Sequence, residues 1–163
     1  MTRYIIPALL FATTPAFAED DWEEPELDIQ TYHGFRMGYS YIQTDKLPTP
    51  HNYVVGYELT QKIGGGDALS VILVENVMLT GLNQSVIIPS ANFLVGFEFA
   101  DRLQIGAGPN IVPVVPEAQM VHMVMGIGYT MKHGALNVPL HFSVIPDVNG
   151  ANRFALTTGV NWK

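Results

Sequence analysis

The chain has 163 residues and no cysteine, so no disulfide can contribute to its stability. Acidic residues outnumber basic ones and give a net charge of −7, and no basic patch indicates nucleic-acid binding. Hydrophobic residues make up 48% of the chain and charged ones only 14%. Beyond the first residues no apolar run is long enough for a membrane helix, which leaves a soluble domain with a large core or a membrane β-barrel.

Residues 1–18 have the layout of a secretory signal. Arg3 precedes an apolar run, and the small residues Ala16 and Ala18 stand at the two positions that a signal peptidase reads. A membrane anchor is the alternative, but the run is short for that role and prolines interrupt it. We predict cleavage after Ala18 and export into a bacterial envelope.

Residues 19–30 follow the signal and are strongly acidic. Seven acids fall between Glu19 and Asp28, whereas the rest of the chain is nearly neutral. A segment of this composition is typical of a solvated, disordered lead-in. A docking tail for a basic partner is the alternative.

Most of the remaining chain alternates between large apolar residues and polar or small ones. In the first such segment Phe35, Met37 and Tyr39 share one face, and Gly34 and Arg36 lie on the other. The segments with this pattern are residues 33–43, 52–63, 91–99, 102–109, 120–131, 136–145 and 153–162. Each predicts an amphipathic β-strand.

An eighth strand is predicted over residues 68–80, which are apolar on both faces. Glu75 has the same parity as Leu73 and Val77, so the register of this strand stays open. A bulge is one way to move the carboxylate to the polar face. Pro139 is a second irregularity, because it stands inside the strand over 136–145, where a bulge or an early strand end would accommodate it.

Long and short connections alternate between the predicted strands. The long ones are residues 44–51, 81–90, 110–119 and 146–152, and the short ones are 64–67, 100–101 and 132–135. Asn149-Gly150 in the last connection is a strong turn signal. This alternation is typical of a membrane barrel with short turns on one side and longer loops on the other. We therefore predict an all-β, closed, antiparallel eight-stranded up-and-down transmembrane barrel over residues 31–163.

The two faces of the strands differ in a way that favours a membrane environment. Aromatic residues on the apolar face gather toward strand ends, as in the two interfacial girdles of a membrane barrel. These residues are Phe35, Tyr41, Tyr53, Phe99, Tyr129 and Trp162. The other face holds mainly small residues, which fit the narrow interior of eight strands. The alternative is a soluble periplasmic barrel that buries its apolar face around a ligand.

The signal, the amphipathic strands and the alternating connections together resemble the small outer-membrane barrels of the OmpA-transmembrane, OmpX and PagP class. The resemblance covers about residues 33–163 and is one of architecture. The closing strand, ending in Trp162, is similar to the aromatic-ended strand that the barrel-assembly machinery reads in this class. Lys163 departs from that pattern, which usually ends on the aromatic residue. The resemblance implies outer-membrane lipid and the assembly machinery as partners.

Charged residues on the small-residue face are predicted to form a lumen charge network. They are Arg36, Glu58, Lys62, Glu98, Arg102 and Arg153. Because buried charges need partners, these mixed signs favour a paired polar plug that fills the lumen. A thin ion path is the alternative, although eight strands leave little room for water.

The pair His141 and Ser143, which share one strand face, is a catalytic candidate. The pair resembles the His-x-Ser of the lipid A deacylase PagL, but no acid follows within 152–156, and both residues are predicted to face the lumen. The other histidines are scattered without metal-ligand spacing, so we predict no metal and no cofactor.

The leading functional hypothesis is a non-enzymatic barrel with a structural or surface-interaction role. Residues 86–89 and 111–116 are unusually apolar for loops, so they could contact a protein partner or the membrane surface, or simply extend the strands. A lipid-modifying enzyme and a narrow channel are the competing hypotheses.

Overall fold

The computed structural model describes residues 28–64, 68–113, 120–147 and 150–163. The predicted signal over 1–18 and most of the predicted lead-in over 19–30 lie outside the described residues. The first strand already begins at Ile29, slightly before the expected start of the barrel at residue 31. Among the described residues, no helix combines the length and apolarity needed to cross a membrane.

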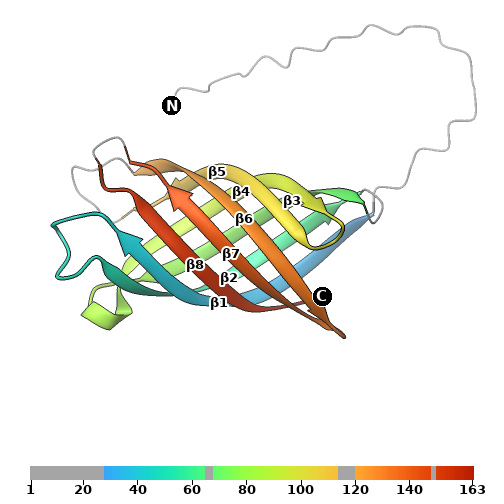
Figure 1. Cartoon of the computed structure of the whole chain (residues 1–163), viewed down its shortest axis with the longest axis horizontal. Helices are drawn as coiled ribbons and strands as arrows, with labels where there is room; N and C mark the ends of the chain where they lie inside the picture. The colour runs from blue at the N-terminus through green and yellow to red at the C-terminus, as the bar shows by residue number, and fades with distance from the viewer. Residues whose placement is uncertain (1–27, 65–67, 114–119, 148–149) are drawn as a thin grey trace, which may run out of the picture.

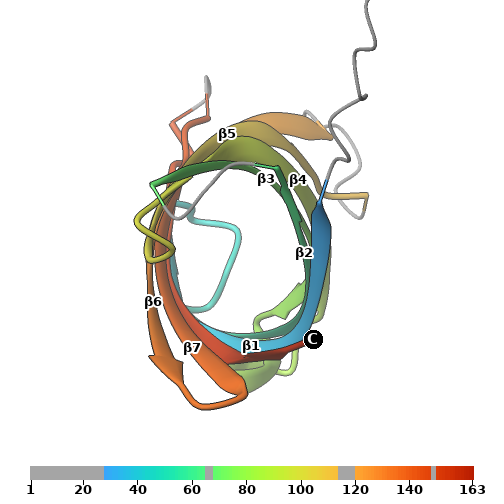
Figure 2. The ribbon, with the colours of Figure 1, turned by 90° about the vertical axis from the view of Figure 1, so that its right-hand side faces the viewer.

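Eight antiparallel strands form one closed barrel in chain order, and β1 pairs with both β2 and β8 (Figure 1). The strands are β1 (Ile29–Ile42), β2 (His51–Ile63), β3 (Leu69–Thr80), β4 (Ile88–Phe99), β5 (Leu103–Ile111), β6 (Val121–His133), β7 (Leu136–Ile145) and β8 (Arg153–Trp162). A single 3-10 turn, η1 (Leu82–Gln84), lies between β3 and β4. The predicted closed up-and-down barrel is confirmed. Figure 2 looks along the barrel and shows the ring of strands.

The two ends of the barrel differ in their connections. The longer loops between β1 and β2, β3 and β4, β5 and β6, and β7 and β8 lie at one end, here called the loop end. The tight turns lie at the opposite end, here called the turn end, and one of them places Ala100 and Asp101 at positive φ. At the loop end Gln84 Nε2 donates to the carbonyl of Thr49 at 2.9 Å, which joins η1 to the β1–β2 loop.

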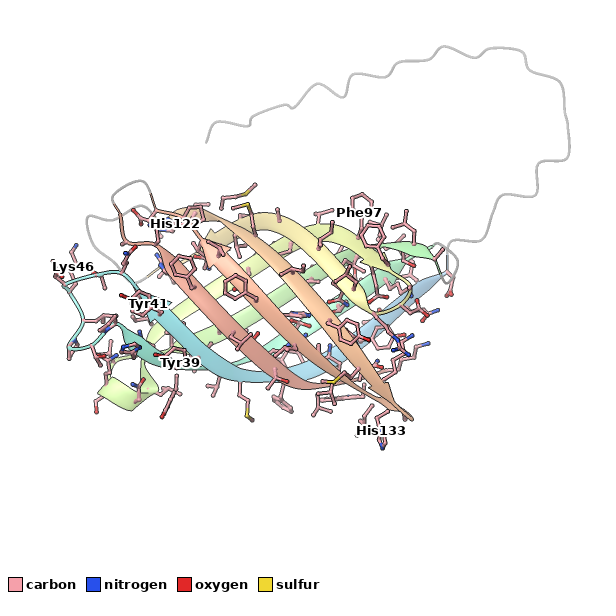
Figure 3. The ribbon with its side chains drawn as sticks, viewed as in Figure 1. Tyr39, Tyr41, Lys46, Phe97, His122 and His133 are labelled. Carbon is pink, nitrogen blue, oxygen red and sulfur yellow. The ribbon has the colours of Figure 1, made fainter. Side chains whose placement is uncertain are left out.

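Alternation along each strand separates an apolar exterior from a smaller, more polar interior. In β6, Met123, Met125 and Ile127 are exposed, whereas His122 and Val124 are buried. Figure 3 shows Tyr39 and Tyr41 on the side of the loop end and Phe97 nearer the turn end. The exterior therefore carries large apolar and aromatic side chains along the whole length of the barrel.

Strand β3 contains no bulge, and this corrects the expectation that Glu75 needs one. Every residue from Leu69 to Thr80 pairs with β4 in a single register. Glu75 is exposed on the outer face, the same face as Leu73 and Val77. In the backbone register it stands opposite Leu59 of β2 and Phe93 of β4. The inward face of β3 carries the large apolar residues Ile72, Val74 and Met78 beside polar ones, which is why the sequence pattern did not separate the two faces.

Pro139 causes neither a bulge nor the end of β7. The pairs Asn137–Asn161 and Leu140–Thr158 flank it in the same register, while the β7–β8 ladder is interrupted between them. The missing proline N–H therefore falls where no ladder bond is made. The Pro139 carbonyl instead accepts a hydrogen bond from Thr158 Oγ1 at 3.0 Å.

Candidate functional site

The lumen is built around a buried ion pair between β1 and β2. Arg36 Nε donates to Glu58 Oε2 at 2.9 Å, and Arg36 Nη2 makes a second, shorter contact with Oε1. Both side chains are almost completely shielded, with a side-chain exposure of 1% each. Thr60 Oγ1 and Asn161 Nδ2 also donate to Glu58 Oε1, at 3.1 and 3.4 Å. A bidentate pair with extra donors is the arrangement that a buried carboxylate requires.

The pair continues into a chain of contacts toward the turn end. His141 Nδ1 lies 3.8 Å from Glu58 Oε2, and His141 Nε2 lies 2.9 Å from Gln104 Oε1. Gln104 Nε2 then donates to Glu98 Oε2 at 2.6 Å, and Lys62 Nζ lies 3.0 Å from Glu98 Oε1. Glu58 and Lys62 come from β2, and the residues that connect them come from β4, β5 and β7, so the contacts cross the interior of the barrel.

The chain of side-chain contacts ends at the turn between β4 and β5. Lys62 also contacts Asp101, and Lys132 Nζ donates to the other Asp101 oxygen at 3.0 Å. These hydrogen bonds from Lys62 and then Lys132 hold the pKa of the Asp101 carboxyl below its ordinary value. We name the whole set the charge plug; its members are Arg36, Glu58, His141, Gln104, Glu98, Lys62 and Asp101.

Four of the six charged residues predicted to form one lumen network are connected by contacts, and two are not. Arg36, Glu58, Lys62 and Glu98 belong to the charge plug. Arg153 faces the lumen near the loop end, where Arg153 Nη2 lies 3.2 Å from His122 Nε2 and His122 Nδ1 lies 3.5 Å from Asp147 Oδ2.

The prediction that Arg102 faces the lumen is wrong. This residue precedes β5 at the turn end, its side chain is exposed, and Arg102 Nη1 donates to the Tyr129 hydroxyl at 3.2 Å. Parity predicted an inward side chain, but alternation holds only within a strand, and Arg102 lies in the turn.

His141 and Ser143 both line the lumen without forming a nucleophile–base pair. The two ring nitrogens of His141 face Gln104 and Glu58, and no hydrogen bond joins His141 to Ser143 in the described part of the chain. A serine nucleophile needs a base within hydrogen-bond reach. The geometry therefore gives these residues a place in the lumen lining and no catalytic arrangement.

A cavity of about 120 Å³ occupies the lumen on the loop side of the charge plug. Glu58, Gln104 and His141 contribute to its floor, and Ile42, Thr80 and other residues at the loop ends of their strands line its upper part. This hollow region differs from the fully side-chain-filled lumen that the sequence suggested. The reason is the size of the inward residues, because several strands contribute only glycine, alanine or serine at this level.

Sequence reasoning missed several participants in the lumen. Gln104 and Asn161 were visible by parity as inward polar residues, but parity says nothing of which partner they bond. Asp101 and Asp147 lie outside the strands, so no alternation could place them. Within the described ranges, no group of three histidine or acidic side chains is arranged to hold a metal ion.

Comparisons with known proteins give a distant likeness in structure. No protein-family model matches the chain, and no curated protein matches it. Among solved structures it is similar to the outer membrane protein Ail of Yersinia pestis, determined as a backbone structure in a phospholipid bilayer nanodisc. The identity is 12%, the match covers 82% of this chain and 100% of that chain, and the TM-score is 0.44. A likeness this distant carries no information on function.

Proposed function

We propose that this protein is an integral outer-membrane β-barrel that does not conduct ions and has a structural or surface-interaction role. The observation that carries the proposal is the apolar exterior of the barrel. Large hydrophobic side chains are exposed on every strand, with exposed fractions that reach 62% at Phe35, 60% at Tyr53 and 61% at Val95. A closed barrel leaves no unpaired backbone edge, so lipid can surround it without orphaned hydrogen-bonding groups.

The soluble ligand-binding barrel is disfavoured by the same exterior. A water-exposed protein rarely carries a continuous apolar surface, and here that surface surrounds the barrel. Strands of 9 to 14 residues are also long enough to cross the hydrocarbon core when tilted. The proposal includes export through the predicted signal over 1–18. It also includes insertion by the barrel-assembly machinery, which would recognise the closing strand β8.

The absence of conduction is proposed from the charge plug. Arg36 and Glu58 satisfy each other in a bidentate contact across β1 and β2, and Lys62, Glu98 and Asp101 extend the paired charges to the turn end. An ion crossing this region would have to displace charges that are already paired and largely shielded from water.

The surface-interaction role is proposed from the loop end. Ile87 and Leu82 expose 61% and 44% of their surface there, beyond the ends of β3 and β4. Apolar side chains at this level can bind an apolar patch on a protein partner or lie on the membrane surface.

Reconstitution into planar bilayers and fractionation of cells test the proposal. The protein should fractionate with outer membranes, migrate differently on a gel when heated, and give no stepwise current. Recovery in the soluble periplasmic fraction without detergent would contradict the membrane assignment. Discrete current steps from the intact protein would contradict the plug and favour a narrow channel.

A further inference from the structure

We propose that the cavity on the loop side of the charge plug is a binding site for an uncharged, mainly apolar molecule that carries one hydrogen-bond donor, such as a hydroxyl group. This inference goes beyond the proposed function, because a barrel with a structural or surface-interaction role needs no luminal ligand. It rests on the residues that create the cavity, the wall opposite them, and two buried polar atoms without partners.

A belt of small residues creates the space. Backbone register pairs its members directly from strand to strand, from β4 through β5, β6, β7 and β8 to β1. The members are Gly96, Gly106, Gly126, Ser143, Ala155 and Ser40, and all six line the cavity. Because the strands are tilted and the belt follows the ladder direction, it forms a band that winds around the inner wall and lacks large side chains over six of the eight strands.

Most of the side chains that line the cavity from β3 are apolar, and Asn76 and Thr80 are the polar ones. Buried Ile72, Val74 and Met78 project inward from β3, and Val54 and Val124 add to them from β2 and β6. Aliphatic side chains that could have packed together instead border an open volume. Contact with such a surface favours an apolar group over water.

Two polar atoms of the lining lack a hydrogen-bond partner. Ser40 Oγ and Asn110 Oδ1 are buried, with residue exposures of 5% and 1%, and neither makes a hydrogen bond with any residue that the structure describes. Asn110 uses its Nδ2 to donate to Asn92 Oδ1 at 2.6 Å, so its free atom is an acceptor. Leaving a buried acceptor unpaired is unfavourable, and a ligand hydroxyl can satisfy one of these two atoms by donating to Asn110 Oδ1 or to Ser40 Oγ.

The charges that face the cavity already have partners, which points to an uncharged ligand. Glu58 is bound by Arg36, His141 contacts Gln104 and Glu58, and Arg153 contacts His122. An anion or cation entering the site would compete with these contacts. The volume suits a small molecule, since about 120 Å³ here compares with the roughly 150 Å³ of an engineered apolar cavity that binds benzene.

Methionine-methyl NMR of the protein in lipid nanodiscs tests the site with three probes of one shape: benzyl alcohol, toluene and benzoate. Met78 reports on the cavity, while Met37, Met123 and Met125 face outward and report on probe dissolved in the lipid. We expect benzyl alcohol to shift the Met78 signal with saturation, toluene to do so about tenfold more weakly because it offers no hydrogen bond, and benzoate to leave it unchanged. A Met78 shift that grows without saturation, in parallel with the outer methionines, would mean partitioning only and would overturn the proposal.

Variants separate the site from its surroundings. Gly126→Leu adds volume to the belt, and a Cβ there lies no closer than 3.6 Å to its neighbours, so the fold should accept it while saturable binding is lost. Ala107→Leu, on the outer face of the adjacent strand, is the matched control and should leave binding unchanged. Saturable binding that survives Gly126→Leu overturns the location. If that variant does not insert, Gly126→Val provides the same comparison with less added volume.

Ser40→Ala and Asn110→Leu test the hydrogen bond by removing one unpartnered atom each. We expect at least one of them to weaken benzyl alcohol binding about tenfold and to leave toluene binding unchanged, because only the alcohol has a hydroxyl to donate. Equal affinities of wild type and both variants for benzyl alcohol would show that the ligand hydroxyl bonds neither Ser40 nor Asn110. That result would overturn the assignment of a donor-bearing ligand.

Discussion

The turn side of the lumen is filled by side chains, whereas the loop side contains a cavity. On the turn side, long charged and amide side chains reach across the barrel and close it with the charge plug. On the loop side, the belt of small residues faces aliphatic side chains and leaves a cavity. The strands are shared by both halves, so the difference comes from side-chain size along successive rows of the ladder.

Neighbouring glycines on β6 show how local this difference is. Gly126 lies in the belt, and a Cβ there would only meet Leu94 Cδ2 at 3.6 Å and the Phe142 carbonyl at 3.7 Å. Gly128 lies one inward position further along, and a Cβ there would fall 2.3 Å from His141 Cδ2. The same residue type therefore keeps a cavity open at one position and admits the imidazole of the charge plug at the next.

The largest expected effect is on the turn side, from Glu58→Ala. This change leaves Arg36 buried without its carboxylate, which typically costs about 3–5 kcal/mol. The free energy of unfolding, measured by urea titration in phospholipid vesicles, should fall by that amount. The control is Asp45→Ala, which removes an exposed acid at the loop end and should change stability little. Equal, small effects of the two substitutions would mean that water reaches the plug and would favour a channel.

The pair Gly128→Ala and Gly126→Ala compares the two halves directly. Gly128→Ala forces the His141 ring to move and should cost about 1–3 kcal/mol, as overpacking usually does. Gly126→Ala should be neutral or raise stability by about 0.4–1 kcal/mol, because the methyl group enters open space and the unfolded chain loses freedom. The same urea titration measures both. If the two variants were equally destabilised, the cavity would be closed in solution.

The closed barrel and the inward position of most luminal charges were predictable because alternation decides the face within a strand. Arg36, Glu58 and Glu98 follow that rule, whereas Arg102 breaks it by lying in a turn. The contacts between the charges were not predictable, since they depend on the register between β1 and β2 and on which side chains meet across the lumen.

The cavity was beyond prediction for the same reason. Gly96, Gly106 and Gly126 were visible as small inward residues, but nothing in the sequence shows that they stand beside one another on neighbouring strands. Only the ladder places each directly opposite the next. A filled interior and a hollow one therefore have the same alternation pattern.

Two glutamates stand on opposite sides of the barrel wall, one facing the lumen and one facing outward. Glu58 is paired in the lumen, whereas Glu75 points outward and makes no hydrogen bond or ion pair with any described residue. A carboxylate on a lipid-facing position is unfavourable, so Glu75→Leu should raise the free energy of unfolding by about 1–2 kcal/mol in the same vesicles. Val77→Leu, on the same outer face, is the control and should change little. A loss of stability in Glu75→Leu would indicate that the carboxylate has a partner outside the barrel.

The smallest expected effect concerns the turn-end limit of the charge plug, and it depends on pH. Hydrogen bonds from Lys62 and Lys132 lower the pKa of Asp101 in the folded protein, so the unfolded state binds its proton first as pH falls. The contribution of Asp101 is therefore fully present above the ordinary aspartate pKa of about 3.9 and is lost as pH falls through the lower, folded-state pKa. Because this acid is partly exposed, we expect only about 0.2–1 kcal/mol.

Asp101→Asn isolates this contribution, because asparagine tolerates the positive φ of 55° at this turn position and so preserves the backbone. The difference in unfolding free energy between wild type and Asp101→Asn should be constant from neutral pH to about pH 5 and then shrink as the solution is acidified further. Asp45→Asn at the loop end, where no lysine contact to the carboxylate is present among the described residues, should give a much smaller difference throughout. An Asp101 difference that stayed constant below pH 3 would mean that its pairing with Lys62 and Lys132 contributes nothing in solution, and the charge plug would then end at Glu98.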